Sequence, residues 1–110
     1  MKAVAVRGQV IERARLNSRD GTTWVAKCTD LDVAVPGDTP LNAVLKLMKS
    51  LEPFFQTVVE KGQYEKSVED RADLFRVPEG GLEIGDYLLN EHDKSFIVVI
   101  GVDIRRQIPV

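Results

Sequence analysis

The sequence is poor in the residues that most often carry covalent or metal chemistry. Among 110 residues there is one cysteine, Cys28, and one histidine, His92. A single thiol cannot form an internal disulfide, and it is typical of a reducing compartment. One cysteine and one histidine are too few for the usual zinc ligand set. We therefore predict no catalytic residue, no metal and no cofactor.

The chain also lacks a long apolar run and a strong excess of charge. No stretch approaches the roughly 18–20 apolar residues that cross a bilayer, and residues 1–15 lack the apolar segment of a signal peptide. Fifteen basic residues oppose 17 acidic ones, and this balance argues against non-specific nucleic-acid binding. We expect a cytoplasmic protein that binds neither a membrane nor DNA directly.

Charge is nevertheless unevenly distributed along the chain. Four arginines crowd the first quarter, at Arg7, Arg13, Arg15 and Arg19, whereas the stretch from Glu60 to Asp93 is rich in acids. These charged side chains either orient a binding partner or are simply solvated surface residues.

Three strands are predicted in the first third of the chain. Residues 3–16 alternate, with one face formed by Val4, Val6, Gly8 and Val10. Ile11 interrupts this alternation, which a bulge near Gly8 would explain. The turn residues 17–21 then lead into a strand over 22–29 and a short strand over 33–35. This order predicts an antiparallel meander.

A long helix is the clearest element in the sequence. Asp38 or Thr39 can cap it, and Pro40 suits the first helical turn. An apolar stripe follows at helical spacing: Leu41, Val44, Leu45, Met48, Leu51, Phe55 and Val58. Pro53 predicts a kink or a split, and Gly62 a helix end.

The last third is less regular. We interpret residues 63–94 as a loop-rich insertion holding one short helix or hairpin. Residues 95–105 include a run that is apolar on both faces, which predicts an interior strand or one covered by a partner. The fold class is therefore α+β: a mainly antiparallel sheet of about four strands, in the order β-β-β-α-β, with one long helix on one face. We expect a single domain over 1–110, and the apolar last strand favours a homodimer.

Residues 21–60 resemble the HicB family of antitoxins, the partners of small RNA-cleaving toxins. The matching residues are Trp24-Val25-Ala26, Asp30-Leu31-Asp32 and Pro36-Gly37-Asp38-Thr39-Pro40, followed by a helix with Ala43 and Val44. The resemblance implies a degenerate ribonuclease H-like fold without catalytic acids, bacterial or phage origin, and a toxin ribonuclease as partner. Family members often carry a DNA-binding unit after this domain, and we expect none here.

The expected function is therefore a non-catalytic domain of a toxin–antitoxin system that neutralises its partner by covering it. Phe54 lies beside the main helical stripe and, with Val59, is predicted to form a second apolar edge. The candidate partner-binding residues are Phe54, Val59, Trp24, Asp30 and Asp32.

Three other hypotheses stay open at this stage. One is an orphan HicB-like protein of phage or mobile-element origin that inhibits another host machine. A second is a metal-dependent nuclease using Glu12, Asp30, Asp32 and Asp103. The third is a nucleophile and base made of Cys28 and His92, although the position of Cys28 in its strand favours a small core residue.

Overall fold

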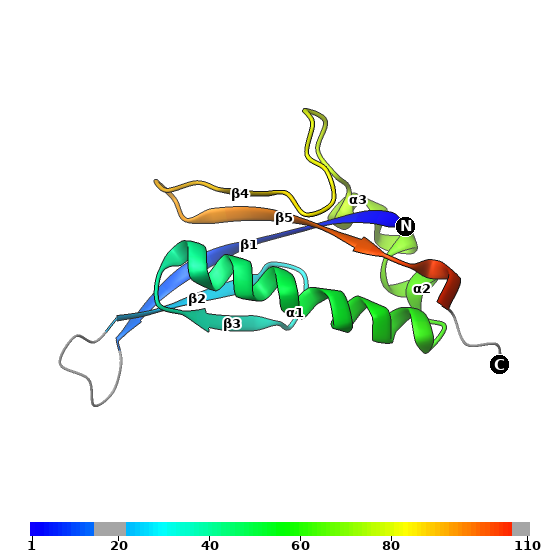
Figure 1. The fold of residues 1–110 in the computed structure, drawn as a ribbon, viewed down its shortest axis with the longest axis horizontal. Helices are drawn as coiled ribbons and strands as arrows, with labels where there is room; N and C mark the ends of the chain where they lie inside the picture. The colour runs from blue at the N-terminus through cyan, green and yellow to red at the C-terminus, as the bar shows by residue number, and fades with distance from the viewer. Residues whose placement is uncertain (15–21, 107–110) are drawn as a thin grey trace.

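The structure is a computed structural model that describes residues 1–14 and 22–106. It is an α+β fold in which the 21-residue helix α1 (Pro40–Glu60) packs on one face of a five-stranded antiparallel sheet. The strands are β1 (Lys2–Ala14), β2 (Thr22–Cys28), β3 (Ala34–Gly37), β4 (Tyr87–Leu89) and β5 (Ser95–Val102), in the order β3-β2-β1-β5-β4. Figure 1 shows α1 running along this sheet. The predicted fold class and the β1–β3 meander are confirmed; the fifth strand, β4, is an addition.

β1 is the central strand, and it changes partner along its length. Its first half pairs with β5, from Lys2 opposite Val102 to Gln9 opposite Ser95. Its second half pairs with β2, from Gly8 opposite Cys28 to Ala14 opposite Thr22. The pairing is continuous through both halves, so the expected bulge near Gly8 is wrong. Ile11 simply points away from α1, and it is 41 % exposed.

Gly8 lies where the two halves of the sheet meet. A Cβ atom there would collide with the backbone carbonyl oxygen of Lys27 and lie 2.6 Å from Cζ of Phe96. The missing side chain therefore makes room for the Phe96 ring inside the sheet–helix core.

The start and end of α1 follow its local chemistry. Between the two expected caps, Thr39 is the one whose side-chain oxygen accepts a hydrogen bond from the Asn42 amide, at 3.0 Å. Pro40 opens the helix, and Gly62, with a φ of 69°, follows its end. The helix continues through Pro53, so the expected split does not occur.

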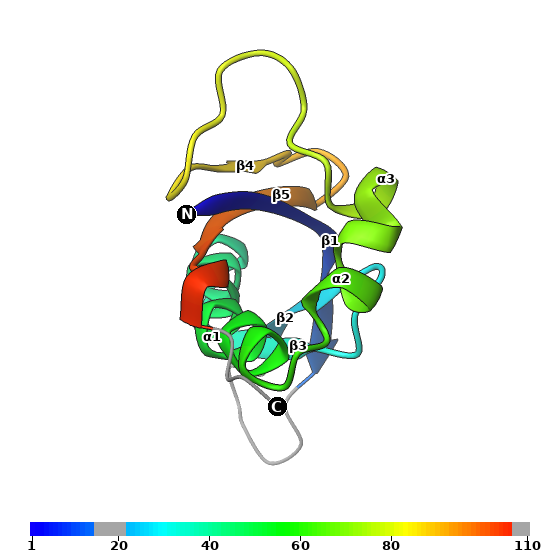
Figure 2. The ribbon, with the colours of Figure 1, turned by 90° about the vertical axis from the view of Figure 1, so that its right-hand side faces the viewer.

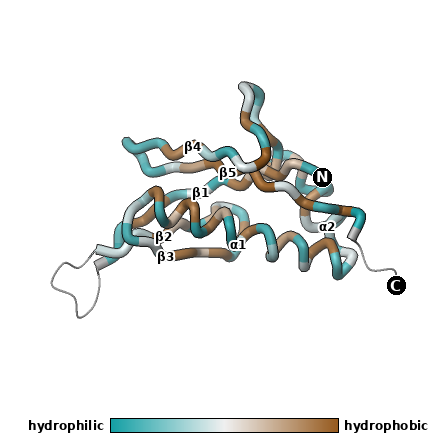
Figure 3. The backbone as a smooth tube through the Cα atoms, in the orientation of Figure 1, coloured by the Kyte–Doolittle hydropathy of each residue, from teal (hydrophilic) through white to brown (hydrophobic). Residues whose placement is uncertain are grey.

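The buried face of α1 is centred differently from the predicted stripe. Its buried residues are Ala43, Val44, Leu47, Leu51, Phe55 and Val59. Leu41 is 38 % exposed, and Leu45, Met48 and Val58 lie on the flanks. Apolar and polar residues alternate turn by turn along α1 (Figure 3). Full burial of a side chain such as Leu47 contributes roughly 1.5–3 kcal/mol.

The predicted insertion has structure of its own. It begins with α2 (Tyr64–Ser67), η1 (Glu69–Arg71) and α3 (Ala72–Phe75), which extend beside β1 on the side away from α1 (Figure 2). The Arg7 guanidinium fastens this segment by donating to the carbonyl oxygens of Leu74 and Arg76, at 3.1 and 2.7 Å. A loop over 76–86 then leads into β4, and the short turn η2 (Ile104–Arg106) follows β5.

We predict that Gly8→Ala destabilises the fold by about 1–3 kcal/mol, because the added methyl group meets backbone and cannot be relieved by a side-chain rotation. Urea unfolding measures this change. The neighbouring substitution Gln9→Ala, on the exposed face, should change stability by less than about 0.5 kcal/mol and is the control. Equal stability of Gly8→Ala and the parent chain would contradict the close approach.

Candidate binding surfaces

The sheet face that points away from α1 is partly open to solvent. On β1, β2 and β3 this face carries a cross-strand apolar row, because Ile11 pairs with Val25 and Val25 with Pro36. Ile11 and Pro36 are exposed, and Val25 is half-buried. We call this region the open face.

The charged side chains of the open face are basic. Lys27 lies beside the apolar row on β2 and Arg13 beyond it on β1, and both are exposed. Neither forms an ion pair with another of the described residues. Glu12, the acid within β1, pairs with Trp24 and so lies on the opposite face of the sheet. Asp38 follows directly after β3. The open face therefore combines a basic character with an apolar centre.

The other end of this sheet face is covered within the chain. Ala5 and Val99, which pair across β1 and β5, are both 0 % exposed. Because the chain itself covers Val99, the two-sided apolar pattern of β5 no longer requires a partner. The homodimer stays a prediction, without this argument for it.

A second surface, of opposite charge, lies along the outer edge of the sheet. Residues 79–93 contain five acids and no lysine or arginine. Its exposed carboxylates are Glu79, Glu83, Glu91 and Asp93, and its exposed apolar side chains are Ile84, Tyr87 and Leu88. This stretch forms the end of the 76–86 loop, the outermost strand β4 and the turn before β5 (Figure 1). We call it the acidic edge.

Local hydrogen bonds favour the charged form of one carboxylate of this edge, that of Asp93. The Asp93 carboxylate accepts from the Ser95 hydroxyl at 2.6 Å and from its backbone N–H at 2.9 Å. These bonds lower the pKa of Asp93 below its ordinary value, because they favour the ionised carboxylate.

The five sequence-predicted partner-binding residues do not form one surface. Val59 is 1 % exposed and belongs to the core, so the second apolar edge with Phe54 is wrong. The reason is that Val59 follows Phe55 by one helical turn and shares its face. Phe54 is 38 % exposed, and its ring packs edge-on against Phe55 with centroids 5.2 Å apart.

The other three predicted residues come from β2 and the connection that follows it. Trp24 is half-buried and packs against the core. Asp30 is half-buried and Asp32 is exposed. No hydrogen bond, ion pair or ring contact among the described residues joins them to Phe54, and their role in partner binding stays a prediction.

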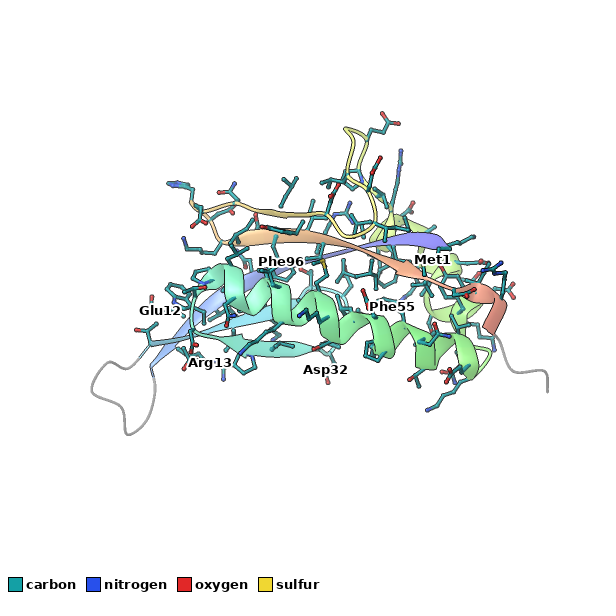
Figure 4. All side chains as sticks on the ribbon, in the orientation of Figure 1. Met1, Glu12, Arg13, Asp32, Phe55 and Phe96 are labelled. Atoms are coloured by element: carbon teal, nitrogen blue, oxygen red, sulfur yellow. The ribbon has the colours of Figure 1, made fainter. Side chains whose placement is uncertain are left out.

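The four acids of the nuclease hypothesis do not converge. Glu12 lies at one end of β1, opposite Trp24, and Asp103 follows Val102, which pairs with Lys2 at the other end. Ten residues of strand separate these positions, or about 33 Å. Figure 4 shows Glu12 at the far end of the molecule from Met1. In residues 1–14 and 22–106, no three acids, histidines or cysteines are grouped as metal ligands.

Cys28 and His92 do not form a nucleophile and base. Cys28 is 2 % exposed and faces the core, whereas His92 is exposed in the turn between β4 and β5. Burial, with a smaller contribution from Asp30, raises the pKa of the Cys28 thiol to about 11. The thiol is therefore protonated at neutral pH.

One cleft was not foreseen from the sequence. It has a volume of about 430 Å³ and is lined by Met1, Glu52, Pro53, Gln56, Ile84, Gly101 and Asp103. The side-chain nitrogen of Gln56 is buried without a hydrogen-bond partner among the described residues. These residues meet only in the tertiary structure, so no sequence pattern could have indicated them.

No family model, curated protein or solved structure matches this chain. Within the described ranges, none of the helices is both long and apolar enough to cross a membrane.

We predict that the stability of the protein falls as the pH rises from about 9 to 11. Over this range the Cys28 thiol of the unfolded chain loses its proton, while the folded chain, with its raised pKa, keeps it. The free energy of unfolding therefore decreases by about 2–3 kcal/mol from this residue alone. Chemical unfolding at a series of pH values measures the decrease.

The control is Cys28→Ala, which removes the ionisable group from the same buried position. Its stability should fall less than that of the parent chain over this pH range. Equal losses in the two proteins would assign the effect to other residues.

Proposed function

We propose that this chain is a non-catalytic protein-binding domain, resembling a HicB-type antitoxin, that neutralises a small RNA-cleaving protein by covering it. The observation that carries the proposal is the acidic edge, with five carboxylates and no lysine or arginine in residues 79–93. Proteins that cleave RNA hold its phosphates with lysine and arginine, so an acidic surface complements them.

The position of the acidic edge suits such a partner. It includes the outermost strand β4, and a strand at the edge of a sheet can pair with a strand of another protein. Leu88 is 55 % exposed, Ile84 46 % and Tyr87 40 %, so apolar contacts are available beside the charges. Opposite charge speeds the encounter, and the apolar side chains slow dissociation.

The order of elements supports the resemblance only in part. Residues 22–60 form two strands and a capped helix, as the HicB-like segment implies. The acidic edge, however, lies in the 63–94 insertion, outside that segment. This placement favours a second candidate, an orphan member of the family that uses the same edge against a different host protein.

The test compares two charge variants as tagged proteins in the host that encodes the chain. Glu79→Lys with Glu83→Lys reverses the acidic edge. Glu52→Lys with Glu60→Lys makes the same charge change at exposed positions of α1 and is the control. We expect a small basic ribonuclease to co-purify with the parent chain and the control but not with the edge variant.

The recovered ribonuclease is then assayed for RNA cleavage. The parent chain should inhibit it at near-equal amounts, and the edge variant should associate at least about tenfold more slowly at low salt. Unchanged RNA cleavage would reject the antitoxin function. Capture of an unrelated host protein through the same edge would support the orphan inhibitor instead.

A further inference from the structure

We propose that the open face of one chain docks the acidic edge of a second copy, forming a symmetric dimer. This inference goes beyond the proposed function, since it requires no toxin. Because both contacts use the acidic edge, a second copy and a toxin would compete for it. The two surfaces are opposite in charge and are both centred on exposed apolar side chains. On a single chain, the loop end of the acidic edge, around Ile84, does not reach the apolar row of the open face.

The open face has the composition of a docking surface for a negatively charged polypeptide. Its apolar row, Ile11, Val25 and Pro36, lies between the ammonium group of Lys27 and the guanidinium of Arg13. Among the described residues of the strands, no aromatic side chain lies on this face. Trp24, Tyr87 and Phe96 all lie on the face toward α1. A surface for single-stranded nucleic acid would stack bases on aromatic rings, so a protein is the better occupant.

The acidic edge has the matching composition. Glu79 and Glu83 bracket the tip of the 76–86 loop, and Ile84 and Leu88 are exposed beside them. Glu79 is especially available, since its side chain is 94 % exposed and its contact with Arg76 is long, at 4.0 Å. Carboxylates and aliphatic side chains thus lie together, as lysine, arginine and aliphatic side chains do on the open face.

Distance separates the loop end of the acidic edge, around Glu79, Glu83 and Ile84, from the open face of the same chain. The other end of the edge borders that face, because the Gln9 side chain, whose residue pairs with Lys27, donates to the Asp93 carbonyl oxygen at 3.5 Å. Ile84 lies against Gly101, whose partner on β1 is Ala3. Arg13 is ten residues farther along the same strand, or about 33 Å away. The loop projects above β5, away from α1 (Figures 1 and 2). Only another molecule can bring Glu79, Glu83 and Ile84 to the Arg13 end of the open face.

Charge also selects the arrangement of two copies. Packing one open face on another would bring lysine and arginine together, and pairing two β4 edges would bring carboxylates together. Both arrangements place like charges in contact. A two-fold arrangement in which each edge meets the partner's face forms the same favourable contact twice.

The experiment is a charge swap in the purified chain. The first variant combines Arg13→Glu with Lys27→Glu and has an acidic open face. The second combines Glu79→Lys with Glu83→Lys and has a basic edge. Sedimentation velocity, at low and high salt, measures the association of each variant alone and of their equimolar mixture.

We expect the parent chain to dimerise, with weaker association at high salt because ions screen the charges. Each variant alone should associate at least about tenfold more weakly, since its face and edge carry like charges. Their mixture should form a dimer again, because each face then meets an edge of opposite sign. This recovery also shows that both variants are folded.

Other results would overturn the proposal. A monomeric parent chain at low salt would exclude the dimer, and dimers unaffected by either variant would place the interface elsewhere. A mixture that stays monomeric would exclude the pairing of face with edge. The proposed function can fail separately, because its assay measures a ribonuclease and this one measures only the purified chain.

Discussion

The structure depends on β1, which pairs with β5 along its first half and with β2 along its second half. Gly8 and Gln9 pair with β5 on one side and with β2 on the other, and no other residue of β1 does so. At Gly8 the missing Cβ lets the Phe96 ring lie against the strand. Through this contact the two halves of the sheet share one core, to which α1 contributes Leu47, Leu51 and Phe55.

Local chemistry predicted much of this fold. The alternation of β1, the Thr39 cap, Pro40 and Gly62 each act within a few residues, so the sequence displays them directly. The face of α1 was harder to predict. Because apolar residues surround more than half of this helix, periodicity alone could not separate Leu47 from Leu45. β4 was missed because three residues carry too little periodicity to indicate a strand.

The binding surfaces were predictable in charge but not in place. The arginines of the first quarter and the acids after Glu60 were evident from the sequence. The tertiary structure decides which of these charged residues share a surface. The strand register places Lys27 beside the row of Ile11, Val25 and Pro36. Arg7 instead donates hydrogen bonds to the carbonyl groups of Leu74 and Arg76. Val59 was misplaced for a different reason: it follows Phe55 by one helical turn, and packing buries the face of α1 that the two residues share.

The residues that pair between β1 and β5 are far apart in the sequence, and this delays their pairing during synthesis. Residues 22–60 can assemble with the second half of β1 from contacts close in sequence, whereas Lys2 must wait for Val102. Until then the first half of β1 exposes Val4 and Val6, together with unpaired backbone groups. For nearly the whole of translation, the nascent chain therefore contains an unpaired strand with exposed apolar side chains. Folding is expected to be completed only as β5 leaves the ribosome.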